Sequence, residues 1–397
     1  MKITKRVFST VLIALAVAVT IASCVFAAPV FKRGDRVVIY GDSITEQQMY
    51  SRYIQQYVQC RYPEMKLKFF NAGWGGDTAP GALNRLERDV LFLKPNVVTL
   101  FFGMNDGGYR SLDQGVVSNY RNNLEKLIKA LLAKKVRVVV FTPGCVDYDK
   151  NAGLGNVKYN EMLEALGVNA LDLAKKYKCQ SADVFHPMLK FMNAQKAIDP
   201  QFTMIPDSVH PNAAGHLVMA NTMLQGLGAE PMPAIGDIDL TSGTGNGLKL
   251  VSKTVTKIVI ETTKPVLAPF WFAPESAFAA QGSGMLNLVA PELKISGLSG
   301  TYKLSIDSEL VGSFTADQLA SGVQIGGSYS NRGKMIHEVT FHKESTYFHM
   351  WRNTRLPLQG LSDLNKIVDS GMALDNTLNE SIRKLTAPKK ATITLDR

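Results

Sequence analysis

The stretch Arg36-Val-Val-Ile-Tyr40, followed by Gly41-Asp42-Ser43 and Ile44-Thr45-Glu46, decides which fold we expect for this chain. After Arg36, this stretch is a continuous apolar run with three β-branched residues, Val-Val-Ile, which is typical of a strand buried on both faces. The polar turn after this strand leads into residues 46–58, which can form a helix. In α/β folds such turns lie at the carboxyl edge of the sheet, where ligand sites form. A serine ahead of a helix is more often a simple N-cap, so this turn alone identifies no site.

Apolar strands and helix-like segments alternate from residue 36 to about residue 227. The expected strands are residues 36–40, 66–71, 96–102, 137–142 and 182–185, and the expected helices are residues 46–58, 82–93, 117–133, 158–177 and 212–227. This alternation indicates a parallel sheet, because right-handed crossovers place helices on both of its faces. We therefore predict a three-layer α/β domain over residues 28–232.

The pattern changes after residue 231. Residues 233–247 contain turn formers without long periodicity and are typical of a linker. Beyond the linker we expect short strands at 248–251, 257–261, 286–288, 294–295 and 302–306, helices over 335–355 and 361–385, and a last strand at 391–395. The sequence thus predicts a smaller α+β module over residues 248–397.

Residues 1–27 have the pattern of an export signal, with a basic start and an apolar run over residues 11–21 that is short for a membrane span. Two endings compete. Residues 25–27 (Val-Phe-Ala) suit ordinary cleavage, whereas residues 21–24 (Ile-Ala-Ser-Cys) resemble a bacterial lipobox in which Cys24 would be lipidated. With either ending the protein leaves the cytoplasm and is periplasmic, secreted or a membrane-anchored lipoprotein. An uncleaved signal is the third alternative.

The bulk composition limits the classes of partner. The 397 residues carry 44 basic and 34 acidic side chains, a formal net charge of +10, but no dense Lys/Arg block of the kind that tracks phosphates. We therefore expect no nucleic-acid partner. The four cysteines, at 24, 60, 145 and 179, show no metal-site spacing, and export would permit one disulfide without fixing its pair. No metal and no cofactor are expected, and the sequence indicates no oligomeric state.

Polar residues follow three further strands of the predicted sheet. The relevant stretches are Asn71-Ala-Gly-Trp-Gly-Gly76-Asp77-Thr78, Gly103-Met104-Asn105-Asp106 and Asp207-Ser-Val-His210. Because the carboxyl ends of parallel strands share one edge of a sheet, we expect these stretches to gather beside Ser43. Four such stretches at one edge are hard to explain as helix caps and surface turns.

A serine hydroxyl is a poor nucleophile until a base lies within hydrogen-bond reach and a third group orients that base. His210 can be this base. Asp207 lies three residues earlier, so one turn can bring its carboxylate to Nδ1 of His210 and leave Nε2 for Ser43. Attack on an ester carbonyl creates an oxyanion, for which the Ser43 N–H, the Gly76 N–H and the Asn105 amide are the best donors.

The same blocks, in the same order, resemble those of the SGNH (GDSL) hydrolases, over residues 36–227. The resemblance implies a flavodoxin-like sheet and hydrolysis of esters or thioesters without a metal. It also implies that Ser43 is the nucleophile and His210 the base, oriented by Asp207. Gly76 and Asn105 would be oxyanion donors. Residues 301–311 resemble, more loosely, the C-terminal part of exported bacterial SGNH proteins.

Several other residues have a less specific interpretation. Trp74 and Tyr109 are candidates for the substrate pocket, although a packed aromatic ring explains Trp74 equally well. His216 and His186 are more easily explained by packing or capping than by catalysis. Asp106 and Asp77 can simply hold their loops through nearby N–H groups.

We therefore expect an exported serine esterase that forms an acyl-enzyme. By analogy with the family, its substrate would be a small or polymeric acyl ester, chiefly an acetylated carbohydrate. A lipid-directed esterase, lysophospholipase or thioesterase is the rival substrate class. A polysaccharide- or surface-binding protein, with binding by residues 236–397 and an incidental hydrolase domain, is the alternative from another class. Membrane contact is expected only through an N-terminal lipid or an uncleaved signal.

Overall fold

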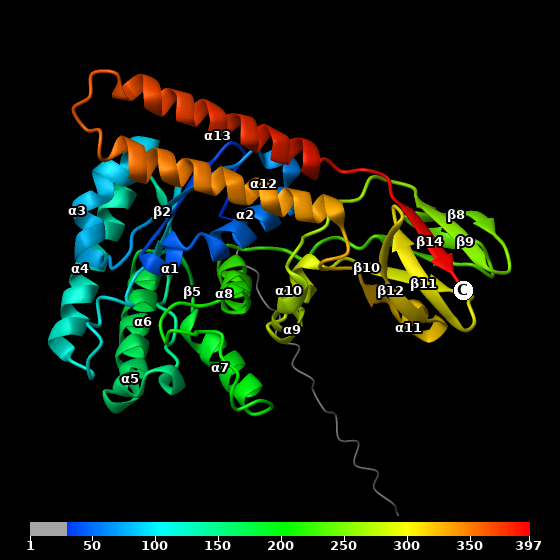
Figure 1. Ribbon diagram of the computed structural model, residues 1–397, viewed down its shortest axis with the longest axis horizontal. Helices are drawn as coiled ribbons and strands as arrows, with labels where there is room; N and C mark the ends of the chain where they lie inside the picture. The colour runs from blue at the N-terminus through cyan, green and yellow to red at the C-terminus, as the bar shows by residue number, and fades with distance from the viewer. Residues whose placement is uncertain (1–29) are drawn as a thin grey trace, which may run out of the picture.

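The computed structural model describes residues 30–397, so the predicted export signal and Cys24 lie outside the described residues. A parallel sheet of five strands lies in the first half of the molecule, with helices around it (Figure 1). The strand order is β2-β1-β3-β4-β5. The strands are β1 (Arg36–Gly41), β2 (Lys68–Gly73), β3 (Val97–Phe101), β4 (Arg137–Phe141) and β5 (Gln180–Ala182). This is the flavodoxin-like order, and it confirms the fold predicted from the alternating pattern.

Helices cover both faces of this sheet. They are α1 (Ser43–Glu46), α2 (Met49–Arg61), α3 (Ala79–Asp89), α4 (Gln114–Ala133), α5 (Ala152–Asn156), α6 (Tyr159–Lys176), α7 (Phe185–Lys196) and α8 (Ala213–Gly226), with single 3₁₀ turns at Pro63–Met65, Leu91–Leu93 and Tyr148–Lys150. Helix α2 packs on α8, while α3, α4 and α6 pack in series. The chain runs from β1 to β2 in one direction across the sheet and from β2 to β5 in the other, so right-handed crossovers place the helices on opposite faces.

Two local predictions in this half were wrong. Phe185 was expected in a strand but begins helix α7, because β5 already ends at Ala182. The helix expected over residues 46–58 begins earlier, at Ser43, and is interrupted at Gln48, whose φ of 58° is left-handed. Asp42 causes the early start, since its side chain accepts a hydrogen bond from the Ile44 N–H and caps α1.

Glycines let α1 rest directly on the ends of two strands. A Cβ atom on Gly41 would lie 2.0 Å from Oγ1 of Thr45, and one on Gly73 would lie 2.2 Å from the backbone nitrogen of Glu46. Neither position therefore tolerates a side chain unless the backbone moves. The close approach fixes the turn that carries Ser43 against the carboxyl edge of the sheet.

The second half of the molecule contains two smaller sheets. One has the order β13-β10-β6-β7 and the other the order β12-β11-β14-β9-β8. Their strands are β6 (Gly236–Asp239), β7 (Thr244–Asn246), β8 (Leu248–Lys253), β9 (Lys257–Thr262), β10 (Glu292–Ser296), β11 (Thr301–Ile306), β12 (Glu309–Thr315), β13 (Val323–Gln324) and β14 (Thr392–Asp396). Two of these strands, β6 and β7, lie within the stretch 233–247 that was expected to be a linker.

Short helices lie between these strands in the sequence. A 3₁₀ turn at Pro274–Ser276, α9 (Ala277–Gly282) and α10 (Met285–Val289) pack on α8 of the first half, whereas α11 (Ala316–Ser321) packs on β10. The strand expected at residues 286–288 was wrong, since these residues belong to α10. The alternation Leu286-Asn287-Leu288 is too short to distinguish a strand from a helix, and here Gly284, with a φ of 81°, starts the helix. Within residues 30–397 no helix is both long and apolar enough to cross a lipid bilayer.

A helical arm returns from the second half to the first. It consists of α12 (Asn331–Phe348), a π-helical turn (His349–Arg355) and α13 (Leu364–Thr386), and Figure 1 shows α12 and α13 side by side. Ile336, Trp351 and Ile382 of this arm belong to the same hydrophobic core as the parallel sheet. The residues of the two smaller sheets form a separate core.

The arm covers the open edge of the parallel sheet at β2. Lys343 of α12 donates a hydrogen bond to the carbonyl oxygen of Phe69, and its Nζ lies 3.3 Å from Oδ1 of Asp375 on α13. Lys343 and Asp375 are both buried. An edge strand otherwise leaves backbone groups unpaired. The arm therefore supplies, through one buried ion pair, a partner for the edge of the sheet.

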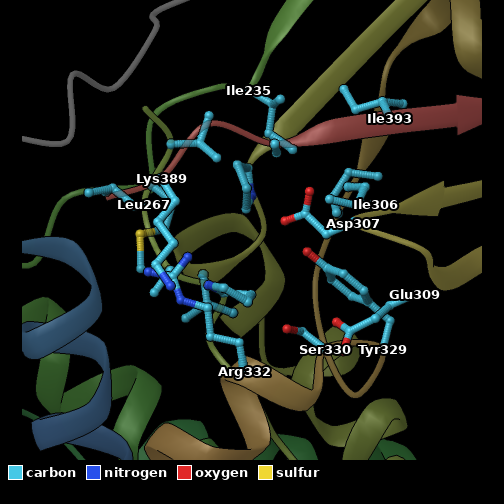
Figure 2. Close-up of a pocket in the computed structure, with 18 of the residues that line it drawn as sticks. Ile235, Leu267, Ile306, Asp307, Glu309, Tyr329, Ser330, Arg332, Lys389 and Ile393 are labelled. Carbon is cyan, nitrogen blue, oxygen red and sulfur yellow. The ribbon is translucent and has the colours of Figure 1, made fainter. Parts of the chain in front are cut away.

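The chain passes five times between the half with the parallel sheet and the half with the smaller sheets. These crossings lie before β6, after β9, before β10, between β13 and α12, and between α13 and β14. All five contribute lining residues to one cavity of about 170 Å³ (Figure 2). The cavity therefore lies at the joint between the two halves.

Candidate active site

Ser43 is the first residue of α1 and is separated from the end of β1 only by Asp42; β1 pairs with β2 on one side and with β3 on the other. The Asp42 side chain accepts a hydrogen bond of 3.0 Å from the Ile44 N–H and so fixes the start of the helix. The first N–H groups of a helix have no acceptor within the helix. The Ser43 N–H is therefore in a suitable position to serve an anion at the sheet edge.

Ser43, His210 and Asp207 form one hydrogen-bonded series. Nε2 of His210 lies 2.8 Å from Oγ of Ser43, and Nδ1 of His210 lies 2.7 Å from Oδ2 of Asp207. The second carboxylate oxygen, Oδ1, accepts hydrogen bonds from the backbone N–H groups of Val209 (3.0 Å) and His210 (2.7 Å). The loop after β5 and α7 thus delivers a histidine whose ring is already oriented towards Ser43.

The backbone of this loop is tightly shaped. Ser208 lies between Asp207 and His210, has a φ of 79° and is almost fully buried. Its carbonyl oxygen accepts a hydrogen bond of 3.1 Å from the Asp147 N–H. The left-handed residue turns the chain so that the carboxylate of Asp207 and the ring of His210 face each other.

Partial burial raises the pKa of Asp207, but hydrogen bonds from the His210 N–H, the His210 ring and the Val209 N–H lower it more, so the pKa lies below its ordinary value. The carboxylate is therefore ionised at neutral pH. Its side chain is 57 % exposed and that of His210 is 34 % exposed, so the site is open to solvent. An ionised carboxylate at Nδ1 favours the tautomer that leaves Nε2 free to accept a proton from Ser43.

Asn105 is held by contacts at both ends of its amide. Its Nδ2 donates a hydrogen bond of 3.0 Å to the carbonyl oxygen of Asp77, and its Oδ1 accepts one of 2.8 Å from the hydroxyl of Tyr109. These contacts define which atom is nitrogen and leave the second N–H of the amide for another acceptor. Tyr109, predicted as a pocket residue, is thus placed where it orients Asn105.

Gly76 lies on the loop between β2 and α3. Its φ is 73°, which favours glycine, and a Cβ atom built on it would meet nothing within 4 Å. The residue is exposed, so its backbone borders open space. Hydrogen bonds tie this loop to its neighbours, since Trp74 N–H donates to the Gly41 carbonyl (3.1 Å) and Asp77 accepts from Asn105.

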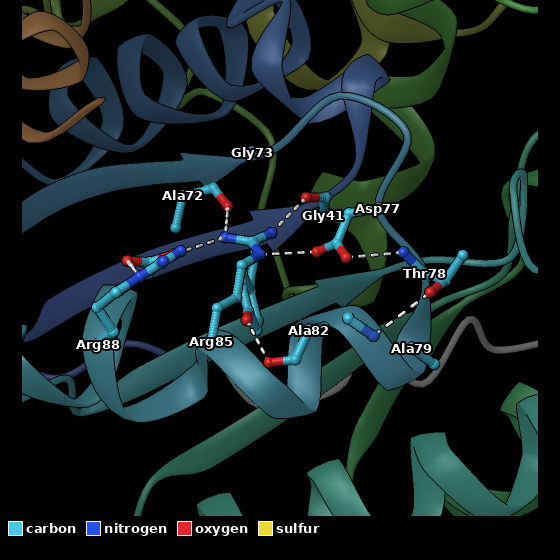
Figure 3. A network of polar contacts seen from close by, with 12 residues as sticks. Gly41, Ala72, Gly73, Asp77, Thr78, Ala79, Ala82, Arg85 and Arg88 are labelled. Carbon is cyan, nitrogen blue, oxygen red and sulfur yellow. Dashed lines mark hydrogen bonds and ion pairs between the residues drawn. The ribbon is translucent and has the colours of Figure 1, made fainter. Parts of the chain in front are cut away.

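A buried arginine fastens this loop to the strand ends (Figure 3). Arg85 of α3 is only 6 % exposed, and its Nε donates to Oδ2 of Asp77 at 2.7 Å. Its Nη1 donates to the carbonyl oxygen of Ala72 (2.9 Å) and its Nη2 to that of Gly41 (3.0 Å), while its guanidinium lies 4.3 Å from the Tyr40 ring centroid. One side chain therefore joins the strand before Ser43 to the loop of Gly76. The motifs gave no signal for Arg85, because two of its partners are backbone carbonyls.

Two buried carboxyl groups lie beneath the same edge. Burial raises the pKa of Asp42 to about 8 and that of Asp106 to about 7, and hydrogen bonds from nearby backbone N–H groups only partly oppose the rise. Oδ1 of Asp106 accepts a hydrogen bond of 2.8 Å from the Ala79 N–H at the start of α3. Both residues therefore hold loops in place, and burial favours their neutral forms.

A polar network links the helical arm to the base of α1. Glu344 of α12 accepts a hydrogen bond of 2.8 Å from the hydroxyl of Ser51, and Ser51 in turn accepts one of 3.1 Å from Asn71. Asn71 also donates to the Thr45 carbonyl (2.8 Å) and accepts from the Gly73 N–H (2.9 Å). Sequence reasoning missed this network, because Glu344 lies 293 residues from Ser51.

The remaining candidates are held by other contacts. The Trp74 ring faces the arm, with the Arg352 guanidinium 3.0 Å from its centroid and the Trp351 ring 6.1 Å away. His216 is buried, contacts Oε1 of Gln47 at 2.9 Å, and burial lowers its pKa to about 3. His186 is exposed and pairs with Asp183 and Glu164. In the described part of the chain no three His, Cys, Asp or Glu side chains gather as metal ligands would.

Residues 39–218 match the GDSL-like lipase/acylhydrolase family, and this stretch contains every residue of the series described above. This part of the chain belongs to the SGNH (GDSL) hydrolase superfamily. The protein is accordingly an ester-hydrolysing enzyme. The family match ends before the smaller sheets and the arm.

Known proteins similar to the SGNH domain include an acetylxylan esterase from Geobacillus stearothermophilus. It is 23 % identical over 219 residues, which cover 50 % of this chain and 95 % of that protein. A solved lipase/acylhydrolase from Enterococcus faecalis is 22 % identical and covers 49 % of this chain and 95 % of its own, with a TM-score of 0.40.

A third similar protein resembles nearly the whole chain and not the SGNH domain alone. The structure of a gut microbial diltiazem-metabolizing enzyme is 22 % identical and has a TM-score of 0.78. The match covers 93 % of this chain and 99 % of that one. The likeness shows that the whole fold, with its smaller sheets and arm, also occurs in another protein.

Replacing Arg85 should destabilise the SGNH domain. Arg85→Met leaves the buried Asp77 carboxylate and two carbonyl oxygens without their donor, so we expect a loss of about 3–5 kcal/mol in the free energy of unfolding. Arg85→Lys keeps the positive charge but loses the planar guanidinium, so its free energy of unfolding should lie between those of the wild-type protein and Arg85→Met. The control is Arg121→Met, which removes a surface ion pair of 3.9 Å to Asp172 and a hydrogen bond of 2.8 Å to Asn169, and should cost about 1 kcal/mol. Urea unfolding measures all three, and equal losses for Arg85→Met and Arg121→Met would contradict the prediction.

The buried Asp42 carboxyl should make stability fall as pH rises. The pKa of Asp42 is raised from 3.8 to about 8 in the folded chain, so between about pH 4 and pH 8 the folded state retains a proton that the unfolded state releases. Stability is then lost as pH rises through this window, by up to about 1.4 kcal/mol per pH unit. Asp42→Asn keeps an acceptor for the Ile44 N–H and should flatten this dependence.

Melting temperatures at pH 5 and pH 8 provide the measurement. The matched control is Asp113→Asn at the start of α4, where an exposed N-cap aspartate accepts from the Gly115 and Val116 N–H groups. We expect the wild-type protein and Asp113→Asn to lose stability in parallel between the two pH values, and Asp42→Asn to lose less. Three parallel curves would show that Asp42 does not carry the pH dependence.

Proposed function

We propose that Ser43 is the nucleophile of the esterase, that His210 is its general base and that Asp207 orients His210. The observation that carries this proposal is the contact of 2.8 Å between Oγ of Ser43 and Nε2 of His210, with Asp207 bound to the other ring nitrogen. This is the geometry in which an imidazole can remove the serine proton as the oxygen attacks.

In the first half of the reaction, Oγ of Ser43 bonds to the acyl carbon and its proton moves to Nε2 of His210. The negative charge that develops on the carbonyl oxygen is met by N–H donors from the Ser43 backbone, the Gly76 backbone and the Asn105 side chain. Each such donor is typically worth about 3 kcal/mol in the transition state. The imidazolium then protonates the leaving alcohol, and an acyl-enzyme remains on Ser43.

In the second half, water takes the place of the alcohol. His210 removes a proton from the water as it attacks the acyl carbon, and the proton is then returned to Oγ of Ser43 as the acid leaves. Asp207 is ionised throughout and stabilises the imidazolium in both halves. The hydrogen bonds of Asn105 to Asp77 and Tyr109 keep its free N–H in one direction, so no reorganisation is needed when charge develops.

We propose that the natural substrate is an acetyl ester on a carbohydrate. Support comes from the similarity to an acetylxylan esterase and from the exposure of Asp207 and His210, which gives a bulky polymer access to the site. We also propose that the protein acts outside the cytoplasm, as a periplasmic or secreted enzyme. The support for export is the basic and apolar pattern of residues 1–27.

Removal of the nucleophile tests the assignment of Ser43. Ser43→Ala should lower the rate of hydrolysis of an activated acetyl ester by at least about 10³-fold, because no acyl-enzyme can form. Ser118→Ala, on the exposed face of α4, is the matched control and should retain the full rate. A Ser43→Ala protein that hydrolyses the ester as fast as this control would refute the role of Ser43.

The substrate class is tested by the length of the acyl chain. On a series of activated esters from acetyl to long-chain acyl groups, kcat/KM should be highest for acetyl and fall as the chain grows. Release of acetate from acetylated xylan should exceed release of fatty acid from a lysophospholipid. A maximum at long chains would contradict the carbohydrate proposal and favour the lipid-directed class, while leaving the nucleophile assignment intact.

A further inference from the structure

The cavity at the joint between the two halves is large enough for a ligand. Its volume is about 170 Å³, and an apolar cavity of about 150 Å³ suffices to bind benzene. Its deeper walls are buried and mostly apolar, formed by Val289, Ile306, Ile325 and Ile393. A ring or a branched aliphatic group would therefore fit this part of the cavity.

Charged side chains of both signs surround the same cavity. Figure 2 shows Asp307, Glu309 and Tyr329 on one wall and Lys389 and Arg332 across the cavity from them. Asp307 and Lys389 are exposed, and Glu309 and Arg332 are partly exposed, so the charges lie nearer to solvent than the apolar walls. A molecule that entered would place its apolar part inside and its charges among these four side chains.

Each of the two carboxylates, Asp307 and Glu309, is held through one of its oxygen atoms. Oδ1 of Asp307 accepts a hydrogen bond of 2.9 Å from the Thr392 N–H, and Oε1 of Glu309 accepts one of 2.9 Å from the Asn331 N–H. Each carboxylate keeps a second oxygen for a cationic ligand group. Burial raises the pKa of Tyr329, and the nearby charges of Glu309 and Asp307 raise it further, so its hydroxyl remains a donor.

Backbone contacts hold the guanidinium of Arg332 and the main chain of Lys389. Nε of Arg332 donates to the Leu385 carbonyl at 2.8 Å, and Nη2 donates to the Ala387 carbonyl. The backbone of Lys389 pairs with that of Val266 through hydrogen bonds of 3.1 and 2.8 Å. The positions from which both side chains extend are therefore fixed, and both can meet an anionic group.

We propose that this cavity binds a small zwitterion with one apolar group of about the size of benzene. Its anionic group would contact Lys389 and Arg332, and its cationic group would contact Asp307 and Glu309. The two positive and two negative charges of these four side chains cancel. A ligand with a single charge would therefore leave one pair, either Lys389 and Arg332 or Asp307 and Glu309, without a partner of opposite charge. Free amino acids with a large apolar side chain are the simplest molecules of this class.

Binding at this place would bridge all five crossings between the halves. Leu267 and Lys389 lie on two of the crossings and Tyr329 on a third, and each lines the cavity. The residues of the proposed active site line no part of it. The proposed ligand site is thus separate from ester hydrolysis and does not depend on which ester the enzyme hydrolyses.

The test is calorimetric titration of the full chain with L-phenylalanine, with 3-phenylpropanoate and with 2-phenylethylamine, which lack the ammonium and the carboxylate respectively. We expect saturable binding of L-phenylalanine and at least about tenfold weaker binding of both singly charged analogues. Absence of saturable binding of L-phenylalanine would overturn the proposal. Equal affinity for either analogue would also overturn it.

Variants locate the site. Lys389→Gln and Asp307→Asn should each weaken binding of L-phenylalanine at least about tenfold. Asparagine keeps an acceptor for the Thr392 N–H and tolerates the φ of 50° at position 307. Lys390→Gln and Asp317→Asn are exposed neighbours that do not line the cavity and should bind as the wild-type protein does.

Two further measurements separate binding from folding and from catalysis. Lys389→Gln and Asp307→Asn should hydrolyse an activated acetyl ester at the wild-type rate, which shows that they are folded. Ser43→Ala should bind L-phenylalanine with unchanged affinity. Unchanged affinity in both cavity variants, or loss of binding in Ser43→Ala, would overturn the assignment to this cavity.

Discussion

The hydrogen bonds of the buried Arg85 guanidinium hold the edge of the sheet together. Arg85 contacts the carbonyl oxygens of Gly41 and Ala72 and the carboxylate of Asp77. A buried cation is tolerated only when acceptors surround it, so these groups and Arg85 constrain one another. The strand before Ser43 and the loop that contains Gly76 are therefore positioned by the same side chain. The proposed nucleophile and a proposed oxyanion donor are thus held by one side chain before any substrate binds.

The helical arm extends this constraint into the C-terminal part of the chain. Glu344 reaches the base of α1 through Ser51 and Asn71, and Arg352 covers the ring of Trp74 on the loop that contains Gly76. Both contacts end on segments that flank the proposed site. The arm is thus part of the scaffold of the SGNH domain, although the family match ends at residue 218. The segment that matches the family is therefore shorter than the unit that packs together, because the arm belongs to the packed unit and lies outside the match.

Much of this arrangement follows from local sequence. The β-branched run before Gly41 predicted β1, and the spacing of Asp207 and His210 predicted that one turn would join their side chains, as it does at 2.7 Å. Contacts that depend on distant backbone atoms left no such signal, and Arg85 is the main example. Residues 286–288 were misassigned because the alternation Leu-Asn-Leu over only three residues fits a strand or a helix equally well.

Lys343 and helix α12 have a consequence for the behaviour of the chain in solution. The backbone of β2 faces α12, and Lys343 satisfies the carbonyl of Phe69. A chain shortened before residue 331 would expose this strand, which could then pair with β2 of another molecule. Helix α12 and the segment that follows it therefore protect the sheet against self-association and aggregation, a task independent of any role in catalysis.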